Sequence, residues 1–185
     1  ITGRVLEALG AFGLGGHPAA RRGVDYLFRV QEPDGSWFGR WGVNYIYGTC
    51  FALRGLRAAG VSSREARIIQ AGEWIRSYQN PDGGWGESPA SYDDPSCKGI
   101  GPSTASQTAW ALMGLFASGD WSTHSVARGI EYLLRTQSPD GGWQEPWFTG
   151  TGFPRVFYLK YHLYAGYFPL IALAEYDARP ARAAL

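Results

Sequence analysis

The chain has 185 residues, enough for one domain with a sizeable core. Its 17 basic and 16 acidic residues nearly balance, which excludes the strongly basic surface of a nucleic-acid-binding protein, so we expect no nucleic-acid partner. No apolar run approaches the roughly 18 residues needed to cross a bilayer. The chain begins without Met and inside an apolar pattern, so we expect it to be a piece of a longer protein.

Two kinds of predicted helix alternate along the chain. One kind is charged on one face, which is typical of outer helices, and the other is apolar nearly all round, which is typical of inner helices. The outer helices are predicted at about 17–30, 64–79 and 123–136, and the inner ones at about 43–59, 104–118 and 156–176, with Thr2–Leu9 as the tail of one more. This predicts an all-α fold, an α/α toroid of inner and outer helices, present here as an incomplete portion.

The ends of these helices carry local signals. Ser62-x-x-Glu65 predicts a capping box at the start of the second outer helix, and Thr104-x-x-Gln107 predicts one at the start of an inner helix. Each box would satisfy free backbone N–H groups in the first turn.

A repeated turn follows each outer helix. Each copy contains Gln, then Pro-Asp-Gly, then Trp six residues after the Gln; the three pairs are Gln31 and Trp37, Gln79 and Trp85, and Gln137 and Trp143. Proline fixes one φ angle, and Asp and Gly favour the turn that follows. We interpret all six residues as structural, with the Gln amide bonding free groups at a helix end and the Trp packing beneath the next unit.

The stretch Gly150–Pro169 is unusually aromatic. A helix beginning after Pro154 would place Phe157, Tyr161 and Tyr164 on one stripe, with Phe153 just ahead, and Pro169 would kink or restart it. Such a stripe usually belongs to a core. It would also suit the wall of a cavity for a reactive cation, because an aromatic ring stabilises a cation by about 0.5–2 kcal/mol per contact without reacting with it.

Other candidate groups give weaker signals. Asp93 and Asp94 would be the pair of a glycosidase-like site, but adjacent carboxylates in a turn more often cap or bind backbone. Cys50 and Cys97 are expected to be reduced. The histidines share no ligand spacing, and no metal site is predicted; they are His17, His124 and His162.

Several motifs together resemble a known family. The three Q-x-x-D-G-x-W turns resemble the QW motifs of the triterpene cyclases. The stretches that resemble the bacterial squalene–hopene cyclases in particular are Trp41–Thr49, Ser91–Ser96, Gly101–Ala111 and Gly150–Pro169. The resemblance covers essentially the whole chain and implies that residues 1–185 are the C-terminal part of the catalytic α/α-barrel domain.

The resemblance also implies a reaction. The family consists of isomerases that cyclise squalene to hopene or hopanol, starting when an Asp of a D-x-D-D motif protonates a terminal double bond. That motif is absent from this chain. The segment would therefore supply aromatic cavity wall and not the acid, and alone it should be inactive. No cofactor or metal is expected, because this chemistry needs a proton, a shaped cavity and aromatic faces.

The resemblance assigns roles to individual residues. Phe153 and Phe157 would stabilise cations around the later-formed rings. The residues expected to bind substrate or to line the cavity and its polar network are Trp41, Tyr47, Leu159, Tyr161 and Tyr164. Arg4 would be a partner of the absent Asp motif, although an exposed Arg pairing with Glu7 at i+3 is an equal alternative.

The resemblance implies partners and a location as well. The substrate would be squalene or a related linear polyprene. The enzyme would be a monotopic protein on the cytoplasmic side of a bacterial inner membrane, and homodimer formation is a further expectation.

Three rival functions remain open at this point. The first is a cyclase of another polyprene such as oxidosqualene, which the details at Asn44–Tyr47 and Phe153-Pro154 disfavour. The second is a non-catalytic repeat scaffold that binds apolar ligands or proteins, which would line the toroid with polar residues. The third is a carbohydrate-active toroid, which needs two separated carboxylates in a cleft.

Overall fold

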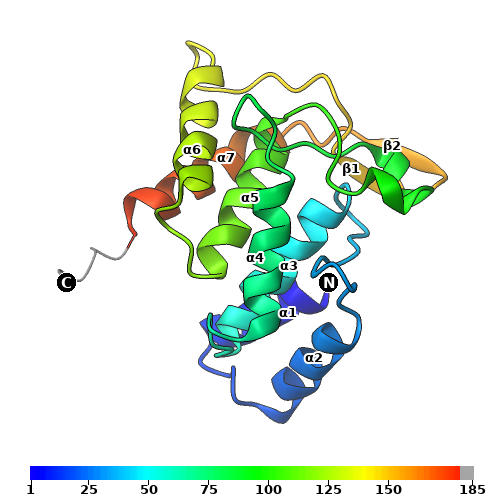
Figure 1. Cartoon of the computed structure of the whole chain (residues 1–185), viewed down its shortest axis with the longest axis vertical. Helices are drawn as coiled ribbons and strands as arrows, with labels where there is room; N and C mark the ends of the chain where they lie inside the picture. The colour runs from blue at the N-terminus through cyan, green and yellow to red at the C-terminus, as the bar shows by residue number, and fades with distance from the viewer. Residues whose placement is uncertain (180–185) are drawn as a thin grey trace.

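The computed structural model describes residues 1–179, which are mostly helical (Figure 1). In chain order the elements are α1 (Thr2–Ala11), α2 (Pro18–Arg29), α3 (Tyr45–Ala58), α4 (Ala66–Ser77), the short 3-10 helices η1 (Pro89–Tyr92) and η2 (Pro95–Cys97), α5 (Ala105–Ala117), α6 (His124–Thr136), the strands β1 (Gly150–Phe153) and β2 (Phe157–Leu159), and α7 (Tyr164–Asp177).

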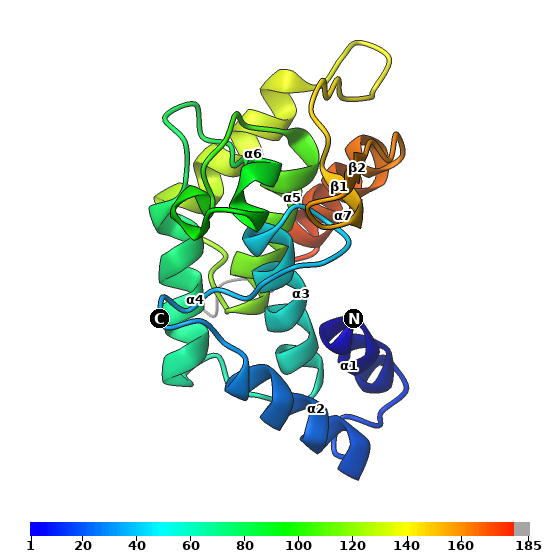
Figure 2. The same cartoon turned by 90° about the vertical axis from the view of Figure 1, so that its right-hand side faces the viewer.

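The helices form an inner row and an outer set. The inner helices α1, α3, α5 and α7 pack against one another in chain order, and every residue of α5 is buried. The outer helices α2, α4 and α6 pack against this row, and Figure 2 shows α4 on one side of α3 and α5 with α1 on the other. The predicted alternation of inner and outer helices is therefore confirmed.

The repeated turns share one set of hydrogen bonds. The Trp Nε1–H donates to a carbonyl ten residues earlier, in the last turn of the preceding outer helix; the pairs are Trp37–Leu27 (2.8 Å), Trp85–Ile75 (2.7 Å) and Trp143–Leu133 (2.9 Å). The Gln Nε2–H donates to the glycine carbonyl that closes its own turn; the pairs are Gln31–Gly35, Gln79–Gly83 and Gln137–Gly141. The Trp, rather than the Gln, thus satisfies the free carbonyl at the helix end.

Two of the glutamines also reach the neighbouring repeat. Gln31 donates to the Arg67 carbonyl of α4 at 3.0 Å, and Gln79 donates to the Ser125 carbonyl of α6 at 2.8 Å. The amide therefore joins successive outer helices as well as closing its turn.

The two predicted capping boxes have different outcomes. Thr104 caps α5, because its Oγ1 accepts a hydrogen bond from the Gln107 N–H at 3.1 Å. The prediction at Ser62 and Glu65 is wrong, since α4 begins at Ala66 and Glu65 makes no side-chain cap bond. Ser62 Oγ instead accepts from the Arg64 N–H, which stabilises the turn before the helix.

The predicted inner helix at 156–176 is wrong in its first part. β1 and β2 pair as an antiparallel hairpin, and the helix begins only at Tyr164. The segment carries threonine and aromatic residues, which favour a strand, and two glycines, which disfavour a helix. Arg155 at the tip has φ 68°, which a right-handed helix does not allow. Phe157, Tyr161 and Tyr164 therefore do not share a helical stripe, and α7 continues through Pro169 without restarting.

An ion-pair group ties three of the inner helices together. Arg54 of α3 lies 2.7 Å from a carboxylate oxygen of Glu7 on α1 and 2.7 Å from one of Glu175 on α7. The Arg54 side chain is only 19 % exposed, so the pair is less screened than a surface ion pair. This group fixes α1 and α7 relative to α3.

Candidate active site

A small β-sheet brings together the aromatic residues that the sequence analysis singled out. The segment 41–43 runs beside β1, and the Thr151 N–H donates to the Trp41 carbonyl at 3.3 Å. Across the hairpin, the Phe153 and Phe157 rings meet edge to face with centroids 5.7 Å apart. These large apolar side chains stay exposed, at 36 % for Trp41, 52 % for Phe153 and 43 % for Phe157. Apolar side chains exposed together indicate a binding surface.

Two glycines in β1 allow aromatic rings to lie directly on the backbone. A Cβ atom at Gly150 would collide with the Tyr161 ring, and one at Gly152 would collide with the Phe157 ring. Leu159, opposite Gly150 in the hairpin, is half-buried. Only glycine at these two positions permits the observed ring positions.

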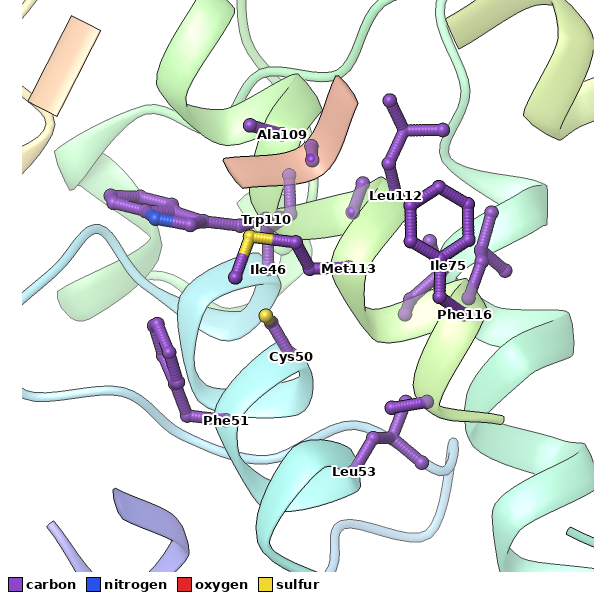
Figure 3. Close-up of a cluster of buried hydrophobic side chains, with 14 of the residues drawn as sticks. Ile46, Cys50, Phe51, Leu53, Ile75, Ala109, Trp110, Leu112, Met113 and Phe116 are labelled. Atoms are coloured by element: carbon purple, nitrogen blue, oxygen red, sulfur yellow. The ribbon is translucent and has the colours of Figure 1, made fainter. Parts of the chain in front are cut away.

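A second aromatic cluster lies behind Tyr47, and sequence reasoning missed its centre. Trp110 of α5 is fully buried, and its ring meets those of Tyr47 (5.0 Å between centroids), Phe168 (5.3 Å) and Tyr164 (5.7 Å). In Figure 3, Trp110 and Phe51 lie on one side of the packed α3 and α5 helices. Within a helix that is mostly apolar, nothing in the sequence distinguishes Trp110 from ordinary core residues.

The remaining predicted tyrosine joins this cluster. The Tyr161 and Tyr164 rings lie 4.7 Å apart, so Tyr161 connects the cluster to the β-sheet through its contact with Gly150. Tyr161 and Tyr164 are therefore in contact, as a shared helical stripe would also have placed them, but Tyr161 lies in the turn before α7.

Arg4, Trp41 and Tyr47 border one groove of about 470 Å³. Its other lining residues, all apolar and in α1 or directly beside its ends, are Ile1, Val5, Ala8, Leu9 and Phe12. The Arg4 guanidinium lies 4.5 Å from the centre of the Phe51 ring. Burial raises the pKa of Tyr47 to about 12, so its hydroxyl stays protonated at neutral pH and can donate a hydrogen bond.

Arg4 also makes the ion pair that the sequence offered as its alternative role. It lies 3.7 Å from Glu7, but its side chain is 54 % exposed, and Glu7 is held more closely by Arg54. Such an exposed pair contributes little to stability. The ion pair therefore coexists with the position of Arg4 in the groove.

The family model described as squalene-hopene cyclase C-terminal domain matches residues 1–178. The chain belongs to this family. The mostly helical architecture described above, with its small β-sheet, therefore belongs to a squalene–hopene cyclase C-terminal domain.

Relatives match the cyclase domain over most of its length. The squalene–hopene cyclase of Alicyclobacillus acidocaldarius is 54% identical over 177 residues, covering 95% of this chain and 28% of that protein. That of Bradyrhizobium diazoefficiens is 54% identical over 155 residues, covering 83% and 24%. The dammaradiene synthase of Dryopteris crassirhizoma is 47% identical over 203 residues, covering 97% and 30%. The domain thus spans about a quarter to a third of the length of these relatives.

A solved structure shares the fold. The ent-copalyl diphosphate synthase from Streptomyces platensis matches with a TM-score of 0.68 and 25% sequence identity, over 95% of this chain and 33% of that one. Together with the family match, this confirms that the cyclase domain is a portion of an α/α toroid.

Two buried carboxylates of the cyclase domain were missed by the sequence analysis. Glu87 Oε2 accepts hydrogen bonds from the Asn44 and Ile46 N–H groups at the start of α3, and Glu145 Oε1 accepts from the Ser106 N–H at the start of α5. Burial raises the pKa of both carboxyl groups. Both cap helices, so neither faces the aromatic sheet as an acid or base. Each Glu follows the Trp of a QW turn by two residues, and this shared position could have pointed to them in the sequence.

The adjacent carboxylates Asp93 and Asp94 do not form a glycosidase-like site. Asp94 Oδ1 accepts a hydrogen bond from the Ser96 N–H at 2.9 Å and caps η2. Asp93 lies 3.4 Å from Arg155 in an exposed ion pair. Asp94 therefore binds backbone, as the sequence favoured, whereas Asp93 pairs with a surface cation.

Proposed function

We propose that this domain supplies the aromatic wall of the active site in a cyclase that converts squalene to hopene or hopanol. The observation that carries the proposal is the exposed pair of Phe153 and Phe157, which meet edge to face in the hairpin, with the exposed Trp41 on the segment beside β1. Within residues 1–179, the groove that Trp41 borders and the groove that Phe153 borders are lined by apolar and aromatic side chains and by arginines, without Asp or Glu.

The aromatic faces, with no carboxylate among the lining residues, suit a carbocation intermediate. Aromatic faces attract a cation, and each contact contributes about 0.5–2 kcal/mol. A carboxylate in the same wall would trap or deprotonate the cation and end the reaction early. The side chains of this domain would therefore hold the folded polyprene, exclude water and stabilise successive cations, while the initiating proton comes from an acid outside this segment.

Arg4 and Tyr47 would serve the other end of the reaction. Both border the groove beside α1, and both can donate hydrogen bonds at neutral pH. In the complete protein we propose that Arg4 orients the acidic motif and that Tyr47 belongs to its polar surroundings. The exposed Arg4 side chain leaves it free for such a contact.

The main alternative is cyclisation of a related polyprene. The match to a dammaradiene synthase is consistent with such an alternative, because a domain of this kind also occurs in an enzyme with another product name. A non-catalytic scaffold is disfavoured, because it predicts polar residues in the lining where the described grooves are mostly apolar and aromatic.

The test is turnover of squalene and of oxidosqualene by the complete protein that carries this domain, with products separated by gas chromatography. We expect pentacyclic products from squalene. Because squalene dissolves in bilayers and not in water, we further propose a peripheral membrane enzyme, and the activity should sediment with the membrane fraction. No helix within residues 1–179 is long and apolar enough to span a membrane. Conversion of oxidosqualene alone, or of neither compound by folded protein, would refute the squalene assignment.

A further inference from the structure

The hairpin that carries Phe153 and Phe157 is joined to η1 at its tip by the long side chain of Arg155. Arg155 has φ 68°, a conformation that an arginine rarely adopts, and its Nε–H donates to the Tyr92 carbonyl at 2.8 Å. This contact joins the tip to η1, which lies far away in the sequence. An unfavourable backbone angle maintained by a specific hydrogen bond points to a required geometry.

Tyr92 in turn holds the neighbouring strand. Its ring is 2 % exposed, and its hydroxyl donates to the Gly42 carbonyl at 3.0 Å, next to Trp41. The same ring stacks on Tyr158 of β2, with centroids 5.9 Å apart and planes 19° from parallel. One side chain thus contacts the segment that carries Trp41 and the strand that carries Phe157. Burial raises the pKa of Tyr92, which keeps the hydroxyl a donor.

We propose that Tyr92 and Arg155 are positioning residues that fix Trp41, Phe153 and Phe157 against the cyclising substrate. This inference rests on the proposed cyclase function. Both side chains border the groove at the tip, and the role proposed for them is to hold the aromatic side chains in place. Because they fix the positions of the aromatic rings, they determine how many rings of the product form before the cation loses a proton.

The space beside the tip gives this role a physical basis. A groove of about 520 Å³ lies between the tip and the rest of the fold. Its lining residues are Phe38, Arg40, Tyr92, Phe153, Pro154, Arg155 and Val156. The tip can therefore move into this groove when its contact with Tyr92 is removed. Cation stabilisation falls steeply with distance from the ring, so a small displacement of Phe153 or Phe157 weakens it.

The experiment uses three variants of the complete protein incubated with squalene. Tyr92→Phe keeps the ring stack and removes the bond to the Gly42 carbonyl. Arg155→Gly removes the anchor and also relieves the unfavourable φ angle, so it should fold at least as readily at the tip. Asp93→Asn is the matched control, because it removes the ion pair of Arg155 and leaves its bond to Tyr92.

The readout is the ratio of early-terminated to pentacyclic products, because a loss of folded enzyme lowers all products equally and leaves this ratio unchanged. We expect the ratio to rise about 5-fold or more in Tyr92→Phe and in Arg155→Gly, and to stay at the wild-type value in Asp93→Asn. If Tyr92→Phe and Arg155→Gly both give the wild-type product ratio, the positioning role is wrong, while the cyclase function still stands. An inactive, folded wild-type protein would instead refute the proposed function itself.

Discussion

Phe157→Ala in the complete protein should release products with fewer rings than the wild type. The Phe157 ring lies on Gly152, beside Phe153 and in the exposed face of the β-sheet, so its removal takes away one aromatic contact to the cation. A contact worth about 0.5–2 kcal/mol corresponds to roughly a 2- to 30-fold change in partition between continued cyclisation and early loss of a proton. Gas chromatography of the squalene products measures this partition directly.

A matched control separates this effect from general loss of an aromatic residue. Phe148 is 54 % exposed, close to the 43 % of Phe157, and lies before β1. Phe148→Ala should leave the product distribution unchanged. If Phe157→Ala gives the wild-type distribution, or if both variants shift it alike, the assignment of Phe157 to the cavity wall is wrong.

Trp85→Ala should produce the largest loss of stability among the QW residues. Trp85 is fully buried, its Nε1–H bonds the Ile75 carbonyl at 2.7 Å, and its ring packs against Gly129 of α6. Truncation leaves a large cavity between repeats and an unsatisfied carbonyl, at a cost of about 3–5 kcal/mol in the free energy of unfolding. Chemical denaturation of the complete protein, followed by circular dichroism, checks this.

An exposed tryptophan provides the comparison. Trp147 is 51 % exposed, and Trp147→Ala should change the free energy of unfolding by no more than about 0.5 kcal/mol. Equal denaturation midpoints for the two variants would show that the QW tryptophan does not join the repeats as the structure indicates.

The alternation of helices could be predicted because it depends on local signals. Pro-Asp-Gly turns, charged faces and apolar faces each act over a few residues, and the turn tryptophans recur at one spacing. The bonds that they make could not be predicted, because Gln31 and Gln79 reach carbonyls of the next outer helix, more than thirty positions away. Glu87 and Glu145 could not be recognised for the same reason, because their hydrogen-bond partners also lie in other repeats.

The hairpin at Gly150–Leu159 shows why the local structure of this segment could not be predicted. The sequence singled out its aromatic residues as a group, but their i, i+4, i+7 spacing also fits a helix, and that pattern was misleading. The strand β1 pairs with β2 and also with the segment 41–43, and the second pairing is distant in the sequence. Trp110 was missed because it lies in a mostly apolar helix, where the sequence gives no sign that its ring contacts Tyr47.

The most direct test of the central claim is a chimera. Residues 1–178 would replace the matching segment of the Alicyclobacillus acidocaldarius squalene–hopene cyclase, with which the chain shares 54% identity. Every other part of the cavity, including the acid, then comes from that enzyme, so squalene turnover reports on the wall supplied by this domain. We predict conversion of squalene to pentacyclic products, with the parent enzyme as control. A chimera that folds, with a melting transition like that of the parent, and yet leaves squalene unchanged or releases only early-terminated products would contradict the account.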